Sequence, residues 1–220
     1  MASTTTPESS RRTARARRDA YVVIPLKTLS RSKTRVALAP GRRRALAAWL
    51  FRHALTTAGA CVGSDHVVVV TSDPWAARLA GGLGMTVVTE RSSGLNAAVT
   101  DGVDHARRCS PRSLVVVMVA DLPRMTIADL ARVLDAVACS PGPCHVADLD
   151  GAGTTLISLP PGTLFHGYFG PGSAALFRAA GYRPVEHAPE GLRADLDTLD
   201  DVRRLMPTWP LAEAAPVPVE

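Results

Sequence analysis

The sequence places a carboxylate directly after an apolar stretch in the middle of the chain. Residues 115–120, VVVMVA, are apolar, and Asp121 follows them with Leu122 and Pro123 behind it. Aspartate is seldom buried without a partner, and a proline disfavours a helical conformation at the residue before it. Asp121 therefore either caps a local structure or holds a charge that belongs to a ligand.

The lysines of this chain are concentrated in one loop. Lysine and arginine together number 25, yet the only two lysines, Lys27 and Lys33, lie between residues 27 and 35, next to Arg31 and Arg35. Lysine is a compact point charge that suits phosphate oxygens, whereas arginine offers a planar fork. The loop therefore predicts a phosphate site; the alternative is a solvated basic loop that holds both lysines by chance.

A second acidic pair lies near the C-terminus. In ADLDTLDDVRRL, residues 194–205, Asp195 and Asp197 are two positions apart and share one face if the segment is extended. Mg²⁺ commonly binds one or two protein carboxylates together with phosphates and water. Asp121, Asp195 and Asp197 are thus candidate Mg²⁺ ligands, although Asp197 could instead simply start a helix.

These residue types favour nucleotidyl transfer. The chain has no GxxxxGK[ST] loop, no GxSxG elbow and no HExxH pair, which leaves phosphate-loop and serine-hydrolase chemistry without support. A phosphate monoester acceptor has a second pKa of about 6, so it needs no general base near pH 7. The protein then has to hold anions in line and neutralise them with cationic side chains and Mg²⁺.

The elements that must position these residues alternate along the chain. Apolar, β-branched runs at 21–26, 66–70, 85–89 and 114–120 predict strands, and the patterns at 41–58, 73–84, 93–108 and 126–138 predict helices. Shorter strands are expected at 144–150, 154–160 and 183–188. This order predicts an α/β domain of three layers with a mostly parallel, Rossmann-like sheet, whose ligands lie beyond the carboxyl ends of the strands. Lys27 and Asp121 follow two of those strands.

Composition limits the remaining classes. Residues 1–19 hold five arginines against two acidic residues and hence +3 of the formal net charge of +5. We expect 1–19 and the Pro-rich 207–220 to be tails around one domain, 20–206.

No aromatic residues interleave with the arginines of the N-terminal tail, so we expect no nucleic-acid partner. The sequence has no apolar run near the roughly 18 residues of a membrane span, and its four scattered cysteines favour a cytoplasmic protein. The oligomeric state is left open.

Six segments together resemble one family. IPLKTLSRSKTR, SSGLNAAV, VADLPRMT, DGAGTTLI, FGPGSAALF and LRADLDTLDDV occur in this order between residues 22 and 205. In this order and spacing they resemble the phospholactate/phosphoenolpyruvate guanylyltransferases of deazaflavin coenzyme F-420 biosynthesis. The resemblance implies a nucleotide-diphospho-sugar-transferase-like fold. It also implies transfer of GMP from GTP to a small phosphorylated three-carbon acid, with release of pyrophosphate.

The resemblance also implies roles for residues. Mg²⁺ would be held by Asp121 and Asp195, and the nucleotide would lie near Gly94 and Asn96, with Lys27, Lys33 and Arg35 on its phosphates. The acceptor would be bound by Thr154, Thr155, Gly170 and Ser173. Two plainer alternatives remain: SGLN as a helix cap and GPG as a turn.

The sequence departs from the family pattern on the acceptor side, at Ala152, Ala174 and Ala175. The acceptor is therefore left open between phosphoenolpyruvate, 2-phospholactate and 3-phosphoglycerate. Other readings are a related nucleotidyltransferase for another acceptor or base, such as a molybdenum-cofactor guanylyltransferase or a cytidylyltransferase, and a non-catalytic phospho-ligand-binding protein.

Overall fold

The computed structural model describes residues 19–29, 33, 35–91 and 94–209. The expected N-terminal tail lies outside this range except for Asp19, and of the expected C-terminal tail only 207–209 are described. Trp209 still contacts the domain, because its ring lies 5.7 Å from that of Trp49. The two domain boundaries otherwise stay predictions.

The described residues form a seven-stranded sheet in the order β3-β2-β1-β4-β6-β5-β7. Its strands are β1 (Tyr21–Leu26), β2 (Val67–Thr71), β3 (Thr86–Val88), β4 (Val115–Met118), β5 (Cys144–Ala147), β6 (Thr154–Leu159) and β7 (Arg183–Pro184). Only β6 runs antiparallel to its neighbours, β4 and β5. The prediction of a mostly parallel sheet is confirmed, and every expected strand is present within a few residues of its predicted bounds.

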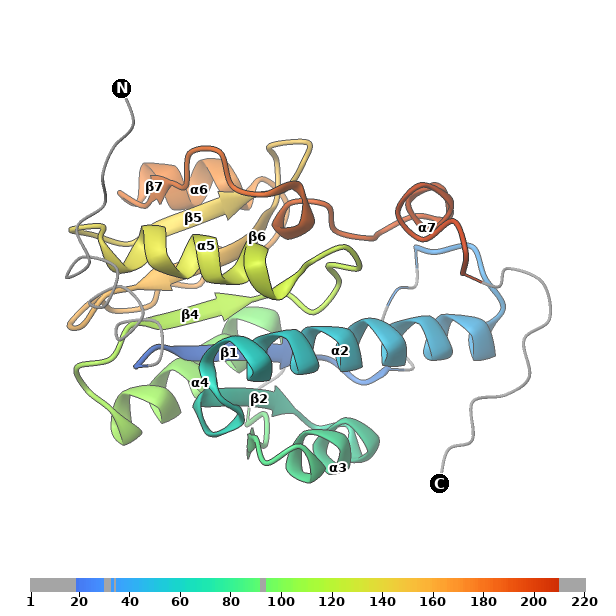
Figure 1. The fold of residues 1–220 in the computed structure, drawn as a ribbon, viewed down its shortest axis with the longest axis horizontal. Helices are drawn as coiled ribbons and strands as arrows, with labels where there is room; N and C mark the ends of the chain where they lie inside the picture. The colour runs from blue at the N-terminus through green and yellow to red at the C-terminus, as the bar shows by residue number, and fades with distance from the viewer. Residues whose placement is uncertain (1–18, 30–32, 34, 92–93, 210–220) are drawn as a thin grey trace.

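Helices cover both faces of the sheet (Figure 1). One face carries α2 (Pro40–Val62), α3 (Pro74–Gly82) and α5 (Ile127–Ala138), and the other carries α4 (Leu95–Cys109) and α6 (Ser173–Ala179). Short 3₁₀ turns occupy Ser64–His66 and Glu190–Leu192. None of the helices in these ranges has the length and apolar character needed to cross a membrane. The three-layer architecture is the predicted one, and the cytoplasmic location stays a prediction.

The alternation of β1 explains how one strand supports both layers. Val22 and Ile24 pack toward α2 and α5, while Val23 packs toward α4. On that side α4 approaches the sheet very closely at Gly102, where an added Cβ would lie 2.4 Å from a methyl carbon of Val23. Only glycine allows this approach, which fixes the position of α4 and therefore of its N-terminus.

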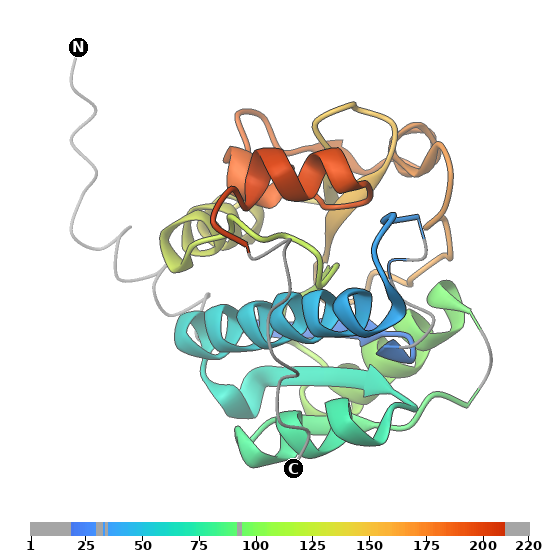
Figure 2. The same cartoon turned by 90° about the vertical axis from the view of Figure 1, so that its right-hand side faces the viewer.

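A third hydrophobic cluster fixes the C-terminal acidic segment. Helix α7 (Leu199–Leu205) lies beside the N-terminal half of α2, away from the sheet (Figures 1 and 2). Ala194 and Leu196 are buried in this cluster, and Asp195 and Asp197 alternate with them. The segment is therefore extended, which is the condition under which Asp195 and Asp197 share one face. Asp197 does not start the helix, because the N-cap of α7 is Thr198, which accepts a hydrogen bond from the Asp201 N–H.

Candidate active site

The candidate site lies at the point where the strand order reverses. The chain leaves β1 for β2 on one side and later returns to β4 on the other, so the carboxyl ends of β1 and β4 flank a crevice. A cavity of about 280 Å³ occupies this place. Its lining includes Lys27, Lys33 and Asp121, with Leu50 of α2 and Leu95 of α4. Residues that the sequence separated by almost a hundred positions thus share one cavity.

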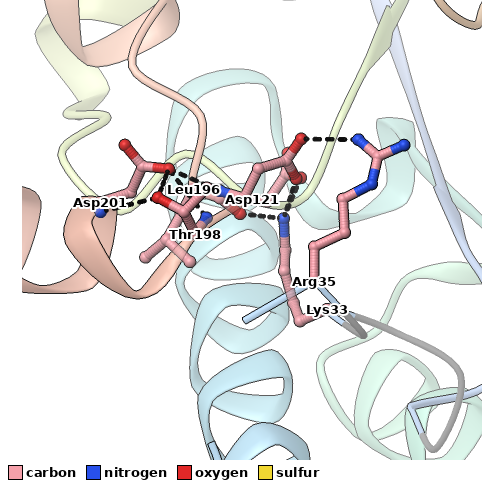
Figure 3. A network of polar contacts seen from close by, with 7 residues as sticks. Lys33, Arg35, Asp121, Leu196, Thr198 and Asp201 are labelled. Atoms are coloured by element: carbon pink, nitrogen blue, oxygen red, sulfur yellow. Dashed lines mark hydrogen bonds and ion pairs between the residues drawn. The ribbon is translucent and has the colours of Figure 1, made fainter. Parts of the chain in front are cut away.

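Lys33 forms the centre of a polar network in this cavity (Figure 3). Its ammonium group donates to Asp121 Oδ2 at 2.5 Å, to Asp197 Oδ1 at 3.2 Å and to the carbonyl oxygen of Leu196. The side chain is only 9% exposed. Burial alone would lower the pKa of Lys33, but the charge of Asp121 and then that of Asp197 outweigh it and hold the pKa above its ordinary value. Lys33 therefore stays a cation.

Asp121 is held by backbone pairing on both sides. The strand before it extends through a hydrogen bond from the Val119 N–H to the Thr155 oxygen, and the Asp121 carbonyl accepts from the Leu196 N–H at 3.0 Å. Leu122 is buried in the core just after it. The following helix, α5, is capped by Thr126 with Asp129 in a reciprocal capping box. Asp121 is therefore not the cap of α5. Its carboxylate is paired with Lys33 in this structure, and its role as a metal ligand stays a prediction.

The carboxylates around Asp121 have few countercharges. Asp121 Oδ1 is buried without a hydrogen-bond partner among the described residues. Burial and then the charges of Asp121, Asp197 and Asp148 raise the pKa of Asp195 to about 7, while Lys33 opposes the shift. The guanidinium of Arg35 lies 3.7 Å from Asp197 but is mostly exposed. The cluster therefore retains excess negative charge, which favours an additional cation.

The lysine loop is fixed at its start by the cap of a neighbouring helix. Asp73 caps α3 by accepting from the N–H groups of Trp75 and Ala76. Its second oxygen also accepts from the N–H of Leu29 at 3.0 Å. The carboxylate is buried, so it ties the end of β2 to the loop that leaves β1 at Lys27. This second bond joins residues 44 positions apart, so no local sequence pattern indicates it.

Two predicted residues lie at the start of α4. Gly94 is the N-cap, with φ 117°, and its N–H donates to the carboxylate of Glu90. Asn96 follows in the first turn, but its side chain is paired with the backbone of Phe169. The neighbouring Leu95 lines the cavity. The start of α4 therefore borders the predicted nucleotide site, while the Asn96 amide is directed to the loop before α6.

The predicted acceptor residues gather around the start of β6. Ser173 Oγ donates to Thr154 Oγ1 at 3.1 Å, and both side chains are buried. Thr155 is also buried, and its hydroxyl donates to the Leu192 carbonyl at 2.5 Å. Gly170 is exposed with φ 147°. Because β6 is antiparallel to β4, residues 154 and 155 lie beside 119–121 at the same edge of the sheet. The acceptor roles stay predictions; the Thr155 hydroxyl already has a partner within the fold.

Comparison with known proteins identifies the family. Residues 32–207 match the model described as the MobA-like NTP transferase domain. The chain belongs to this family. It is 44% identical over 187 residues to a protein named phosphoenolpyruvate guanylyltransferase from Thermomonospora curvata, covering 83% of this chain and 81% of that one. A protein of the same name from Streptomyces scabiei is 38% identical over 190 residues, covering 83% and 88%. The resemblance expected from the six segments is confirmed, and the chain is a nucleotidyltransferase with a guanylyltransferase role.

A solved structure shares the fold. A putative nucleotide-diphospho-sugar transferase from Desulfovibrio desulfuricans superposes with a TM-score of 0.59 at 15% identity, covering 85% of this chain and 86% of that one. At this identity the match supports the architecture alone. The nucleotide-diphospho-sugar-transferase-like fold predicted for the transferase is confirmed.

Sequence reasoning missed one acidic residue near the candidate site, Asp148. Asp148 follows β5 directly, and β5 is parallel to β4, so both strands end at the same edge. Its carboxylate accepts from the N–H groups of Ala152 and Gly153, and its charge contributes to the raised pKa of Asp195. The signal was available in CHVADLD, where an acidic residue ends an apolar strand as it does at Asp121.

Proposed function

We propose that this transferase moves GMP from GTP to phosphoenolpyruvate, or to another phosphorylated three-carbon acid such as 2-phospholactate or 3-phosphoglycerate, in the formation of a deazaflavin coenzyme of the F-420 type. The names of the relatives support the donor and the acceptor class. The single observation that carries the proposal is the partly buried Lys33–Asp121 pair in the cavity between β1 and β4. A cation and a carboxylate in one strand-end crevice suit phosphate chemistry.

The reaction exchanges one phosphoanhydride bond for another. A phosphate oxygen of the acceptor attacks the α-phosphorus of GTP, and the bond from that phosphorus to the bridging oxygen of the β-phosphate breaks, so that pyrophosphate leaves. The acceptor is already ionised near neutral pH and gives up no proton. Lys27 and Lys33 would hold phosphate oxygens and neutralise the charge that accumulates on them.

Mg²⁺ fits the carboxylates of the site. Asp121 has a buried oxygen without a hydrogen-bond partner among the described residues, and burial together with the neighbouring carboxylates raises the pKa of Asp195. Among the described residues no three His, Cys, Asp or Glu side chains form a ready-made metal site. Mg²⁺ commonly binds one or two protein carboxylates, and phosphates and water complete its coordination shell. Asp121 and Asp195, with Asp197 beside them, would hold the ion, which supplies charge neutralisation to the phosphates when bound.

The acceptor would lie on the β6 side of the cavity. Thr154 and Ser173 are joined by a hydrogen bond, and Gly170 begins the turn into α6. Of these residues, Thr154 lies in the sheet beside the segment that ends at Asp121. An acid bound there would meet the nucleotide phosphates near Lys33. Thr155 would contribute by holding β6 to Leu192.

The proposal is tested by a matrix of substrates. The four nucleoside triphosphates are each combined with phosphoenolpyruvate, 2-phospholactate and 3-phosphoglycerate, with Mg²⁺ or with a chelator, and pyrophosphate release and product mass are measured. We expect release with GTP and Mg²⁺, and a product whose mass is that of the acid plus a guanylyl group. Turnover with CTP alone, or none with any of these acids, would overturn the proposal.

A further inference from the structure

The side chain of Asn96 forms a reciprocal pair with the backbone of one distant residue. Its Oδ1 accepts from the Phe169 N–H at 3.0 Å, and its Nδ2 donates to the Phe169 carbonyl at 3.0 Å. Two antiparallel hydrogen bonds to one residue fix both distance and orientation, as a pair of residues does in a β-ladder. Helix α4 and the loop before α6 are thereby joined across 73 positions of the chain.

A close packing contact supports this pair. An added Cβ at Gly167 would lie 2.7 Å from Asn96 Cβ, closer than real Cβ atoms approach, and 3.0 Å from Asn96 Cγ. The loop therefore lies directly against Asn96 and requires glycine at this position. On the other side, the ring of Phe169 lies 5.1 Å from that of Phe177 in α6. Asn96 thus fixes the backbone of a residue that is itself packed on α6.

Both ends of this connection lead to the proposed site. Leu95, next to Asn96, lines the cavity, while Phe169 precedes Gly170 and lies four residues before Ser173. Ser173 in turn bonds Thr154 beside the end of β4. The Asn96 amide uses one oxygen lone pair and one N–H in its bonds to the loop. The side chain is therefore oriented toward the loop and not toward the nucleotide.

We propose that Asn96 is a positioning residue for the phosphorylated acid: it sets the loop from Gly167 to Ser173 in the orientation that binds the acceptor, and does not itself recognise GTP. This inference rests on the proposed function for the identity of the acceptor. It reassigns Asn96, which sequence reasoning placed beside the nucleotide. The physical basis is that removal of the amide leaves a buried backbone N–H and carbonyl at Phe169 without their partners, so that the loop gains alternative conformations.

The test compares the two substrates separately. In Asn96→Ala, we expect KM for phosphoenolpyruvate to rise at least tenfold, with KM for GTP within about threefold of the wild-type value. Gly167→Ala disturbs the same contact from the loop side and should shift KM for the acceptor in the same direction. Thr100→Ala is the matched control: its hydroxyl donates to the Asn96 carbonyl on the exposed side of the same helix, and both KM values should stay near wild type.

A second measurement does not depend on turnover. Hydrogen exchange of the backbone amides of 167–173 should be faster in Asn96→Ala than in the wild type, with α4 beyond its first turn unchanged. Unchanged exchange would overturn the inference, as would a rise in KM for GTP with an unchanged acceptor KM, or equal rises in both. Wild-type protein that releases no pyrophosphate with these substrates would instead overturn the proposed function, and the exchange experiment would still decide the structural role of Asn96.

Discussion

Lys33 Nζ lies 2.5 Å from Asp121 Oδ2 and 3.2 Å from Asp197 Oδ1, so a buried ammonium group separates carboxylates from two distant segments. Lys33 itself adopts a left-handed backbone conformation, with φ 56°, which non-glycine residues rarely do. The surrounding contacts compensate for this conformation. Lys33 thus has two roles. It is the proposed phosphate ligand, and in the free protein it is the counter-ion that offsets the repulsion between Asp121 and Asp197.

The counter-ion role predicts a coupling in stability. In Mg²⁺-free buffer, Lys33→Met should lower the free energy of unfolding by about 1–3 kcal/mol, because Asp121 and Asp197 lose their buried partner. Adding Asp121→Asn to this variant should restore at least half of the loss, since one unpaired charge is then removed. Urea denaturation of the two single variants and the double variant completes the cycle. Strictly additive effects would mean that the pair is not coupled.

The phosphate role predicts that charge alone is not sufficient at this position. Lys33→Arg should impair turnover nearly as much as Lys33→Ala, because a planar guanidinium cannot occupy the compact position between Asp121 and the Leu196 carbonyl. Steady-state kcat/KM with GTP is the measurement. An arginine variant with full activity would mean that any cation serves, and that the concentration of lysines in this loop is accidental.

The raised pKa of Asp195 predicts a stability that depends on pH. A carboxyl group whose pKa in the folded protein is about 7 favours folding in its protonated form. That contribution is fully present below its ordinary pKa near 4 and is lost as the pH rises through about 7. Asp195→Asn has no such loss, so its Tm without Mg²⁺ should exceed that of the wild type by several degrees at pH 8.

The advantage of Asp195→Asn should shrink toward zero near pH 4, where Asp195 of the wild type is protonated as well. Asp200→Asn is the matched control, because Asp200 is 87% exposed on the neighbouring helix. Its Tm should follow the wild type at every pH. A difference between Asp195→Asn and wild type that is the same at pH 4 and pH 8 would contradict the assignment.

Local patterns predicted the elements of this fold well, since the Val-rich strands and the helical patterns between them are local features of the sequence. What they could not predict is which distant segments pair. The bond from Leu196 to the Asp121 carbonyl and the Asn96–Phe169 pair each join segments more than 70 residues apart. Such contacts are decided by the packing of the whole domain, so they left no local signal. The hydrogen bond from the Thr155 hydroxyl to the Leu192 carbonyl could not be predicted for the same reason.

The most direct test of the nucleotidyltransferase site is to measure pyrophosphate release by two single variants. Asp121→Asn is the test variant, and Asp129→Asn, eight residues further along the chain, is its control. Asp121→Asn removes the charge proposed to hold Mg²⁺, so kcat/KM should fall at least a hundredfold, or about 2.7 kcal/mol of transition-state stabilisation, with Tm within a few degrees of wild type. Asp129→Asn weakens the cap of α5 and should lose about 1 kcal/mol of stability while keeping its activity. Asp121→Asn with near-normal turnover would contradict the account.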